Sequence, residues 1–479
     1  MYRYIHGAFY DLTPFIASHP GGTTILHMSR GMADATPVME SYHAFANKEY
    51  IAKTLAKYKI DYTPKDAETR EKTETTYTFD ENGFYATLTR RVRAHFGSTK
   101  ENESITRNIK ANYWWTFKVA TQTVMYLALY AVAFVVPGVP TIVSILSAAL
   151  AGMMIIAVGM NAMHDGSHYA IGARDSWKNK LAMRIWNAAA YWDPAEWLFH
   201  HTIRHHAYTG DSVLDPGEFL WAQCSASTGP TTNLFQTDTL HANPAVRKHL
   251  ETPRSMFFES FPRILAVERW FWAIWSAIIY VFFPGMFTMQ IFTYKFAWPF
   301  VGSLWNMPYE KTKGVFEKYW WEYAITLSMF AAHVYKFNPF VSIAFFMAAN
   351  LTYALCIVPD HDTYDSAILN HVSGDRVDWG EIQVRHASDF GGLGVLGRAF
   401  TEMFGSINVQ IAHHLYPSVN HIYLPEIQPI IKQTCAEFNI PYAHQKTMLE
   451  AAWSFIKTVH RCMAPDEIFE ADHQVKKVQ

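Results

Sequence analysis

Long apolar stretches without charged side chains dominate the middle of the chain. Residues 119–163 contain no Asp, Glu, Lys or Arg, and only Pro137–Pro140 interrupts the apolar pattern. One membrane-spanning helix needs about 20 apolar residues, so this stretch predicts two crossings joined by a tight turn. A second pair is predicted over 319–335 and 339–358, with a turn at Lys336–Asn338. The pattern therefore predicts an integral membrane protein with four crossings.

The apolar segment 270–300 is less regular than these four. Pro284 and Lys295 interrupt it. A short hairpin, a re-entrant segment and an interfacial helix would each fit such a pattern.

The N-terminal part of the chain has a different pattern. Residues 1–60 alternate between apolar and polar side chains and then follow a helical period, which predicts a compact soluble unit. Residues 61–110 are charged and predict a linker with one amphipathic surface helix near 84–96. We expect residues 111–479 to form the membrane domain. Amphipathic helices within 176–200 and 424–458 would lie on or cap its cytosolic face.

The composition supports a membrane protein in a reducing compartment. Hydrophobic residues make up 50% and charged residues 17%, against about 25% charged residues in soluble domains. The net charge of -2 gives no basis for a nucleic-acid partner. The four scattered cysteines argue against a disulfide framework and against a thiolate metal site. The first residues lack the apolar core of a signal peptide, so we expect a cytosolic N-terminus.

Three histidine clusters lie beside the hydrophobic stretches. On a helix, residues four apart project from one face, as His164 and His168 would. Imidazole suits iron, copper, zinc and nickel, and seven such ligands exceed the needs of one tetrahedral zinc. The clusters therefore predict a site shared by two metal ions. Its members are His164, His168, His201, His205, His206, Gln410, His413 and His414.

The predicted topology brings these clusters together. An even number of crossings separates the second cluster from the third if each apolar block forms a hairpin, so all three clusters lie on the side of the N-terminus. Histidines at the ends of membrane helices are costly unless they are paired or ligated. Basic residues flank the first two crossings, as expected for the cytosolic side. They are Arg90, Arg91, Arg93, Lys118, Arg174, Lys178 and Lys180.

The N-terminal unit carries a second histidine pair. His19 opens the sequence His-Pro-Gly-Gly, and His43 lies within Glu-Ser-Tyr-His-Ala-Phe. The glycines permit a tight turn that brings the backbone close to a bound ring. Two histidines on opposite walls of an apolar cleft could ligate haem iron from both sides. With Tyr10-Asp11 before His19 and Asp34–Thr36 between the pair, the unit resembles cytochrome b5, and the resemblance implies a bound haem b.

A cytochrome b5-like unit ahead of three histidine boxes resembles the front-end fatty acyl desaturases. The resemblance covers nearly the whole chain. Its most specific part is the third box, which that family begins with Gln, as in Asn408–Pro417 here. The first box, His164-Asp-x-x-His168, and the second, His201-x-x-x-His205-His206, match as well. The resemblance implies two non-haem Fe ions that activate O2 and introduce a cis double bond into a polyunsaturated acyl chain.

The resemblance has further implications for fold, partners and location. It implies a small α+β haem domain fused to an all-α integral membrane domain with four transmembrane helices and a cytosolic histidine-box cap. Electrons would come from NADH through NADH-cytochrome b5 reductase and the haem, and the substrate would be a membrane lipid or an acyl-CoA. We expect a multi-pass protein of the endoplasmic reticulum membrane with both termini cytosolic. The last residues, Lys476–Gln479, resemble a retrieval signal.

The family supplies one more ligand before the third box, and His361 stands at that position. His386 would support a ligand without binding metal. The chain departs from the family pattern at Ala412, where Glu is usual, and after the second box, where it reads Asp215-Pro-Gly. Tyr4 stands near an expected Trp close to the first residue, so we expect this unit to be shortened or to lack its first strand.

The resemblance also predicts supporting roles. Asp165 and Asp360 would accept hydrogen bonds from ligand N–H groups. Trp114 and Trp115, like Trp320 and Trp321, are expected to anchor the protein at the membrane interface.

Three other functions compete with desaturation. A cytochrome b5-fused fatty acid or sphingolipid hydroxylase uses a similar centre with different box spacings. A catalytically inactive membrane haem carrier would not need every box histidine. A zinc hydrolase would need an acid or base in a pattern such as HExxH, which is absent from His164–His168.

Overall fold

The computed structural model describes most of the N-terminal unit and of the histidine-box domain. The described residues are 3–29, 32, 34–62, 75–173, 175–189, 197–211, 214–215, 270, 274, 321, 324–361, 363–368, 374–392 and 394–462. Most of the segment 270–300, Trp320 and the C-terminal Lys476–Gln479 lie outside them.

A three-stranded antiparallel sheet opens the chain. The middle strand β2 (Ala8–Tyr10) pairs with β1 (Arg3–Ile5) and with β3 (Lys59–Ile60). Short helices pack on it around a small core that includes Ile5, Leu12, Ile16 and Leu26. They are η1 (Thr13–Ser18), α1 (Thr23–Met28), α2 (Thr36–His43) and α3 (Lys48–Ala56). The expected α+β unit is therefore present at the N-terminus, with its β1 strand starting at Arg3.

The segment after this unit is tied to the rest of the protein. Strand β4 (Thr75–Thr78) pairs in parallel with β5 (Gly374–Asp378). The predicted amphipathic helix is α4 (Phe84–His95), and its apolar face is buried. Its side chains share one core with α2 and with the C-terminal helices. This part of the predicted linker is therefore packed into the fold.

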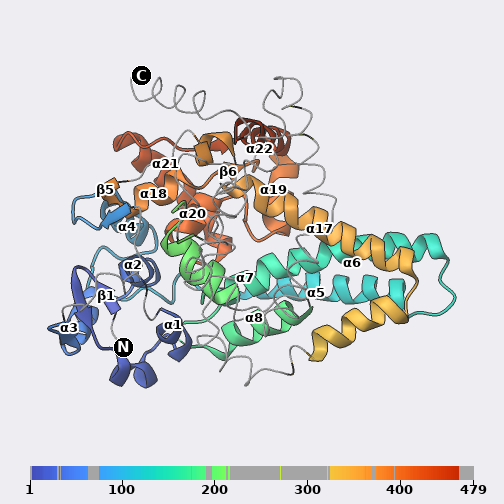
Figure 1. Ribbon diagram of the computed structural model, residues 1–479, viewed down its shortest axis with the longest axis horizontal. Coiled ribbons are helices and arrows are strands. Elements are labelled where there is room, and N and C mark those ends of the chain that lie inside the picture. The colour runs from blue at the N-terminus through green and yellow to red at the C-terminus, as the bar shows by residue number, and fades with distance from the viewer. Residues whose placement is uncertain are drawn as a thin grey trace, which may run out of the picture.

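Among the described residues, three helices are long and apolar enough to cross a membrane. They are α5 (Tyr113–Phe134), α6 (Thr141–Val158), whose helical path continues to Ser167, and α17 (Pro339–His361). Another apolar helix, Ala324–Tyr335, is shorter in its described part. Together these helices project from one side of the molecule (Figure 1). The membrane character is confirmed, whereas the predicted number of four crossings is not.

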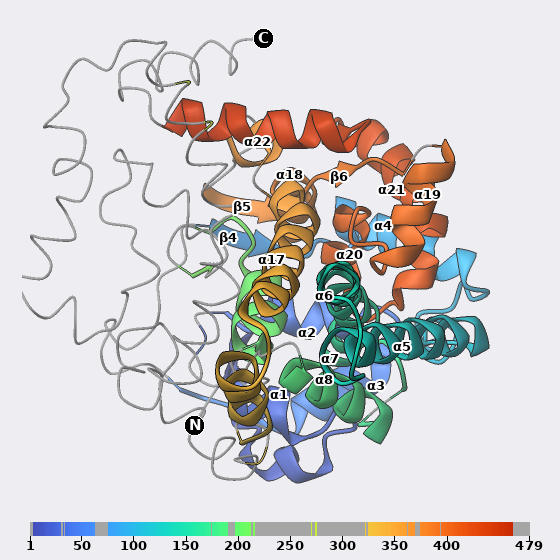
Figure 2. The same cartoon turned by 90° about the vertical axis from the view of Figure 1, so that its right-hand side faces the viewer.

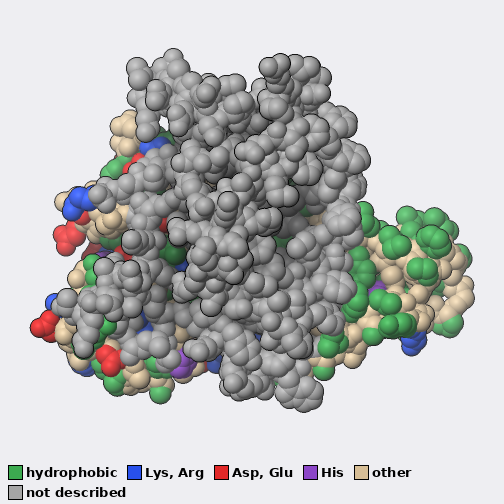
Figure 3. All heavy atoms as spheres, viewed as in Figure 1, with side chains coloured by type: hydrophobic (Ala, Val, Ile, Leu, Met, Phe, Trp, Pro, Cys, Tyr) green, Lys and Arg blue, Asp and Glu red, His purple; other side chains and the backbone are tan. Residues whose placement is uncertain are grey.

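The projecting helices bury one face and expose another. Gly152 of α6 packs so closely on α17 that an added Cβ atom would collide with the carbonyl oxygen of Phe345. The opposite faces expose large apolar side chains, which gather at the projecting end in Figure 3. They include Val124, Leu127, Ile142, Leu146 and Phe340. Exposed apolar surface of this extent is expected where lipid replaces water.

The remaining helices form a cap over the inner ends of α6 and α17 (Figures 1 and 2). Amphipathic helices appear where the pattern predicted them, within 176–200 and 424–458. A short parallel pair, β6 (Asp389–Phe390) with β7 (His444–Gln445), ties the last part of the cap together. The helices are α7 (His164–Ser167), α8 (Trp177–Ala189), η4 (Leu198–His205), η7 (Tyr364–Ile368), α18 (Trp379–Arg385), α19 (Gly394–Met403), α20 (Gln410–Leu415), η8 (His421–Tyr423), α21 (Leu424–Glu437) and α22 (Met448–Cys462).

Candidate metal centre and haem site

The histidine boxes converge into two groups of possible metal ligands. One group contains His164, His168, His201 and His413, and the other contains His205, His361 and His414. Within each group, one nitrogen from every imidazole lies within 4.8 Å of the others. The predicted dinuclear arrangement therefore has a place for each ion.

The helices that carry the boxes are locally widened. Helix α6 passes through a π-helical turn, η3 (Gly159–Met163), before His164, and the second box lies in the π-helical segment η4. Such turns are frequent at functional sites. Along η4, His201 belongs to one group and His205 to the other. Their rings are 5.5 Å apart, so η4 forms a wall shared by both groups.

His206 and Gln410 complete the predicted set. The ring of His206 lies 4.5 Å from that of His168 and 4.3 Å from that of His414, between the two groups. Gln410 brings its amide nitrogen to 3.1 Å from His361 Nε2. The structure thus brings together all of the box residues predicted from the sequence, including His361 at the end of α17.

Several of the outer histidine nitrogens have fixed partners. Asp215 Oδ1 lies 2.9 Å from His205 Nδ1, and the carbonyl oxygen of His386 lies 2.8 Å from His361 Nδ1. His414 Nδ1 lies 3.0 Å from Gln383 Oε1. Such contacts set the tautomer and direct the other ring nitrogen towards a metal. The expected supporting role of His386 is therefore filled by its main chain.

The Nε2 nitrogens, which point into the two groups, are suited to bind a metal. The Nε2 atoms of His168, His413 and His414 are buried and accept or donate no hydrogen bond within the described residues. Burial lowers the pKa of these three imidazoles well below the usual range, so they are neutral at pH 7. Metal binding needs a neutral imidazole with a free lone pair. The donor set therefore suits two cations that prefer nitrogen ligands.

Two expected supporting residues have other contacts. Asp165 Oδ2 accepts hydrogen bonds from Trp115 Nε1, Asn420 Nδ2 and His421 Nδ1, each at 2.7 Å. The prediction that Asp165 holds a box histidine is therefore wrong, because its carboxylate instead binds one side chain of α5 and two at the start of η8. Trp115 is buried by the same contact and is no interface anchor, whereas Trp114 is exposed.

Several residues around the box histidines were missed by the sequence analysis. Gln383, Thr209 and Tyr42 each reach a histidine Nδ1 from a different element. Asp215 was noted only as a departure from a family pattern. Its position close behind the second box was the one signal that could have indicated its contact with His205.

The two histidines of the N-terminal unit are placed so that both could bind one metal ion between them. The rings of His19 and His43 are 6.1 Å apart. His19 Nδ1 lies 2.8 Å from the carbonyl oxygen of Gly22, and His43 Nδ1 lies 2.7 Å from that of Met39. Gly22 adopts φ 88°, which favours glycine. With both outer nitrogens held by the main chain, both Nε2 atoms remain available, so the pair fits haem iron.

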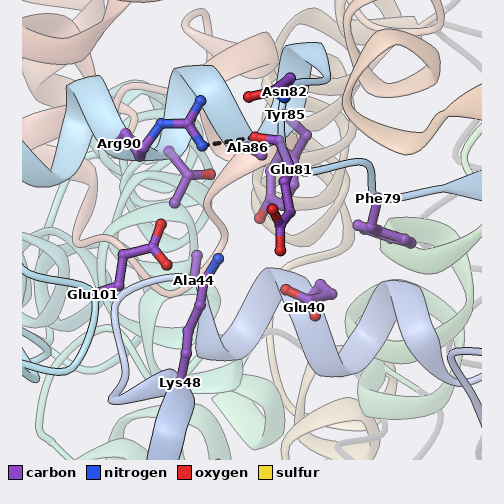
Figure 4. Close-up of a pocket in the computed structure, with 11 residues that line it drawn as sticks. Glu40, Ala44, Lys48, Phe79, Glu81, Asn82, Tyr85, Ala86, Arg90 and Glu101 are labelled. Atoms are coloured by element: carbon purple, nitrogen blue, oxygen red, sulfur yellow. Dashed lines mark hydrogen bonds between the residues drawn. The ribbon is translucent and has the colours of Figure 1, made fainter.

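A cleft of about 310 Å³ lies between the N-terminal unit and α4 (Figure 4). Glu40, Ala44 and Lys48 line one wall, and Tyr85 and Arg90 of α4 line the other. Acidic and basic side chains both line the cleft, but no imidazole or thiol does. The cleft is therefore separate from the two histidine sites.

Comparison with known proteins identifies both parts of the chain. Residues 1–63 match the cytochrome b5-like heme/steroid binding domain, and residues 285–446 match the fatty acid desaturase family. An acyl-lipid (8-3)-desaturase of Physcomitrium patens is 26% identical over 95% of this chain and 87% of its own length. An acyl-lipid (8-3)-desaturase of Mortierella alpina is 24% identical over 95% of this chain and 92% of its own length. Delta(5) fatty acid desaturase A of Dictyostelium discoideum is 25% identical over 95% and 89%.

Proposed function

Because the chain joins a cytochrome b5-like domain to a fatty acid desaturase domain, we propose that it is a front-end fatty acyl desaturase. The observation that carries the proposal is the convergence of two histidine groups at the inner ends of α6 and α17. An apolar acyl chain that lies along these membrane helices would end at the predicted metal pair. The product would gain a cis double bond on the carboxyl side of an existing one.

The two histidine groups would each hold one non-haem iron. Together the irons supply the O2 chemistry that removes two hydrogens from an unactivated acyl chain. Asp215 and Gln383 keep His205 and His414 in the tautomer that leaves Nε2 free. The Gln410 amide, beside His361, would orient that ring or bind weakly through its buried oxygen.

The buried position of the site has a chemical consequence. His168, His206 and His414 are almost fully buried, so the reacting carbons would be kept away from bulk water. A ligand set made mainly of neutral imidazoles would leave the metal pair strongly cationic. Such a charge would favour anionic groups at the same position.

His19 and His43 would be the axial ligands of haem b in the N-terminal unit. The haem would pass electrons, one at a time, from NADH-cytochrome b5 reductase to the iron pair. NADH would be the electron source and O2 the co-substrate.

We propose that the acyl group is carried on a membrane lipid. The relatives from Physcomitrium patens and Mortierella alpina are named acyl-lipid desaturases, and the apolar faces of α5, α6 and α17 open towards lipid. Ala324–Tyr335 would belong to a fourth crossing. Both termini would then be cytosolic, in the membrane of the endoplasmic reticulum.

Lipid analysis of yeast that expresses the full chain tests the proposal. Cells are fed a panel of polyunsaturated acids of different lengths, and both lipid-bound and CoA-bound acyl groups are analysed over time. A new double bond on the carboxyl side, first seen on a lipid, supports the proposal and gives its position. A hydroxylated product, or a product absent despite iron and haem at normal levels, contradicts it. His95→Ala is the control, because that side chain forms an exposed pair with Glu426.

A further inference from the structure

One side chain of helix α2, which carries His43, reaches the metal groups directly. The Tyr42 hydroxyl lies 2.7 Å from Nδ1 of His168, a member of the first metal group. Tyr42 is also the neighbour of His43, the predicted haem ligand, on helix α2. Among the described residues, it is the residue of the N-terminal unit whose side chain hydrogen-bonds a box histidine.

The direction of this hydrogen bond follows from a second contact. The Tyr42 hydroxyl also lies 3.4 Å from the carbonyl oxygen of Thr202 in the second box. A carbonyl can only accept, so the hydroxyl donates to Thr202 and its oxygen accepts from His168 Nδ1–H. This arrangement places the proton of His168 on Nδ1 and leaves Nε2, which is buried without a partner, for the metal.

Helix α2 separates this contact from the polar cleft. Glu40 and Ala44 line the cleft (Figure 4). Tyr42 is two residues from each, so it projects from the other side of the helix. There its ring lies nearly parallel to that of His168, with an interplanar angle of 14° and ring centroids 6.3 Å apart. The side of α2 that carries Tyr42 therefore faces the metal groups, and the side that carries Glu40 and Ala44 faces the cleft.

We propose that Tyr42 links the haem ligand His43 to the iron ligand His168 and speeds electron transfer between the two sites within one chain. The proposal rests on the function proposed above. In each transfer, one electron leaves the ferrous haem, which becomes ferric, and reduces one ferric iron to the ferrous state. No bond is made or broken at Tyr42, and no proton crosses it. Two transfers accompany each double bond.

Tyr42→Phe tests the link, because it removes the hydroxyl and keeps the ring. Tyr208→Phe is the matched control, since the Tyr208 hydroxyl also joins the N-terminal unit to the second-box helix. It donates to the carbonyl oxygen of Asp34 at 2.7 Å and accepts from the amide N–H of the same residue at 3.1 Å. Full-length proteins in lipid nanodiscs are first compared for iron content, haem absorbance and melting temperature.

The decisive measurement is the rate of haem reoxidation by the iron pair. The haem is reduced without oxygen by less than one equivalent of dithionite, and its absorbance is followed after rapid mixing. We expect Tyr42→Phe to retain iron and haem but to transfer electrons about 10- to 100-fold more slowly, the range found when outer partners of metal ligands are removed. Tyr208→Phe should transfer at the normal rate.

Other outcomes overturn the link. An unchanged rate in Tyr42→Phe, or equal slowing in Tyr208→Phe, removes any special role for this hydroxyl. Loss of iron from Tyr42→Phe alone would show that the residue only supports the fold of the iron site. The measurement needs no acyl substrate. A normal transfer rate in a wild-type protein that makes no product would therefore count against the proposed function and leave the link intact.

Discussion

The proposed haem site and the proposed metal centre both consist of histidines, but the outer nitrogens of these histidines are held in different ways. In the haem site, His19 and His43 bind main-chain carbonyls three and four residues away. In the metal centre, His205 and His414 bind the side chains of Asp215 and Gln383. Gln383 lies on another element, far away in the sequence. The haem site is therefore a local structure, and the metal centre is a product of the whole fold.

This difference indicates how each site should respond to mutation. Main-chain partners cannot be removed by substitution, so the haem site depends mainly on its two histidines. The metal centre depends on its ligands and also on a ring of side chains that orients them.

The largest expected effect is the loss of a ligand from the first metal group, which contains His413. His413→Ala should lose iron and lower desaturation by more than about 100-fold, beyond the range typical for outer partners. Haem absorbance should stay normal, because the two sites share no ligand. Metal analysis and product analysis check this, with His95→Ala as the control. Full iron content in His413→Ala would show that the ligand assignment is wrong.

Removal of a haem ligand should have the opposite pattern. His43→Ala should lose the haem absorbance and most of the activity while iron content is retained. His6→Ala is a control within the same unit, because the exposed His6 side chain pairs with Glu40 and touches the ring of Phe79. Absorbance spectra and metal analysis separate the two sites. An unchanged spectrum in His43→Ala would contradict the haem assignment.

A smaller effect is expected from an outer partner of the metal centre. Asp215→Asn keeps the size of the side chain but replaces a carboxylate that holds His205 Nδ1 at 2.9 Å. We expect iron affinity or activity to fall about 10- to 100-fold. Iron titration of the metal-free protein measures the change. An affinity equal to that of the wild type would mean that the tautomer of His205 is set elsewhere.

The smallest expected effect is a pH dependence of the metal-free protein. Burial lowers the pKa of His201, His206 and His413 well below the usual range. The unfolded chain binds protons near about pH 6.5, where the folded state does not, so stability is present above this pH and falls below it. The melting temperature of the metal-free protein should therefore decrease from about pH 7 to pH 5. The decrease should be smaller in His413→Gln, and a flat profile in the wild type would contradict the prediction.

The sequence predicted the parts of both sites that follow local patterns. The spacing of His164 and His168, the Gln that opens the third box and the glycines after His19 each depend on neighbouring residues. The same holds for the apolar helices α5, α6 and α17. The comparisons confirm the predicted combination of a cytochrome b5-like and a desaturase domain. The domain boundaries and the ligand role of each histidine remain predictions.

The remaining features depend on contacts between distant segments. Asp165 belongs to the first box, but its carboxylate binds Asn420 and His421 at the start of η8. No local sequence pattern indicates this contact. The division of His201 and His205 between the two groups is also not indicated by their spacing in the sequence. Tyr42 reaches His168 only because α2 packs on the cap.

The parallel pairing of β4 with β5 sets an order of events during protein synthesis. Strand β4 leaves the ribosome early, whereas its partner is made only after the membrane helices and the first two boxes. The core that α4 shares with Leu415 and Ile427 likewise forms only after those two residues have been synthesised. Non-local pairing of this kind is slow. The N-terminal unit and α4 can therefore complete their packing only after the third box has been made.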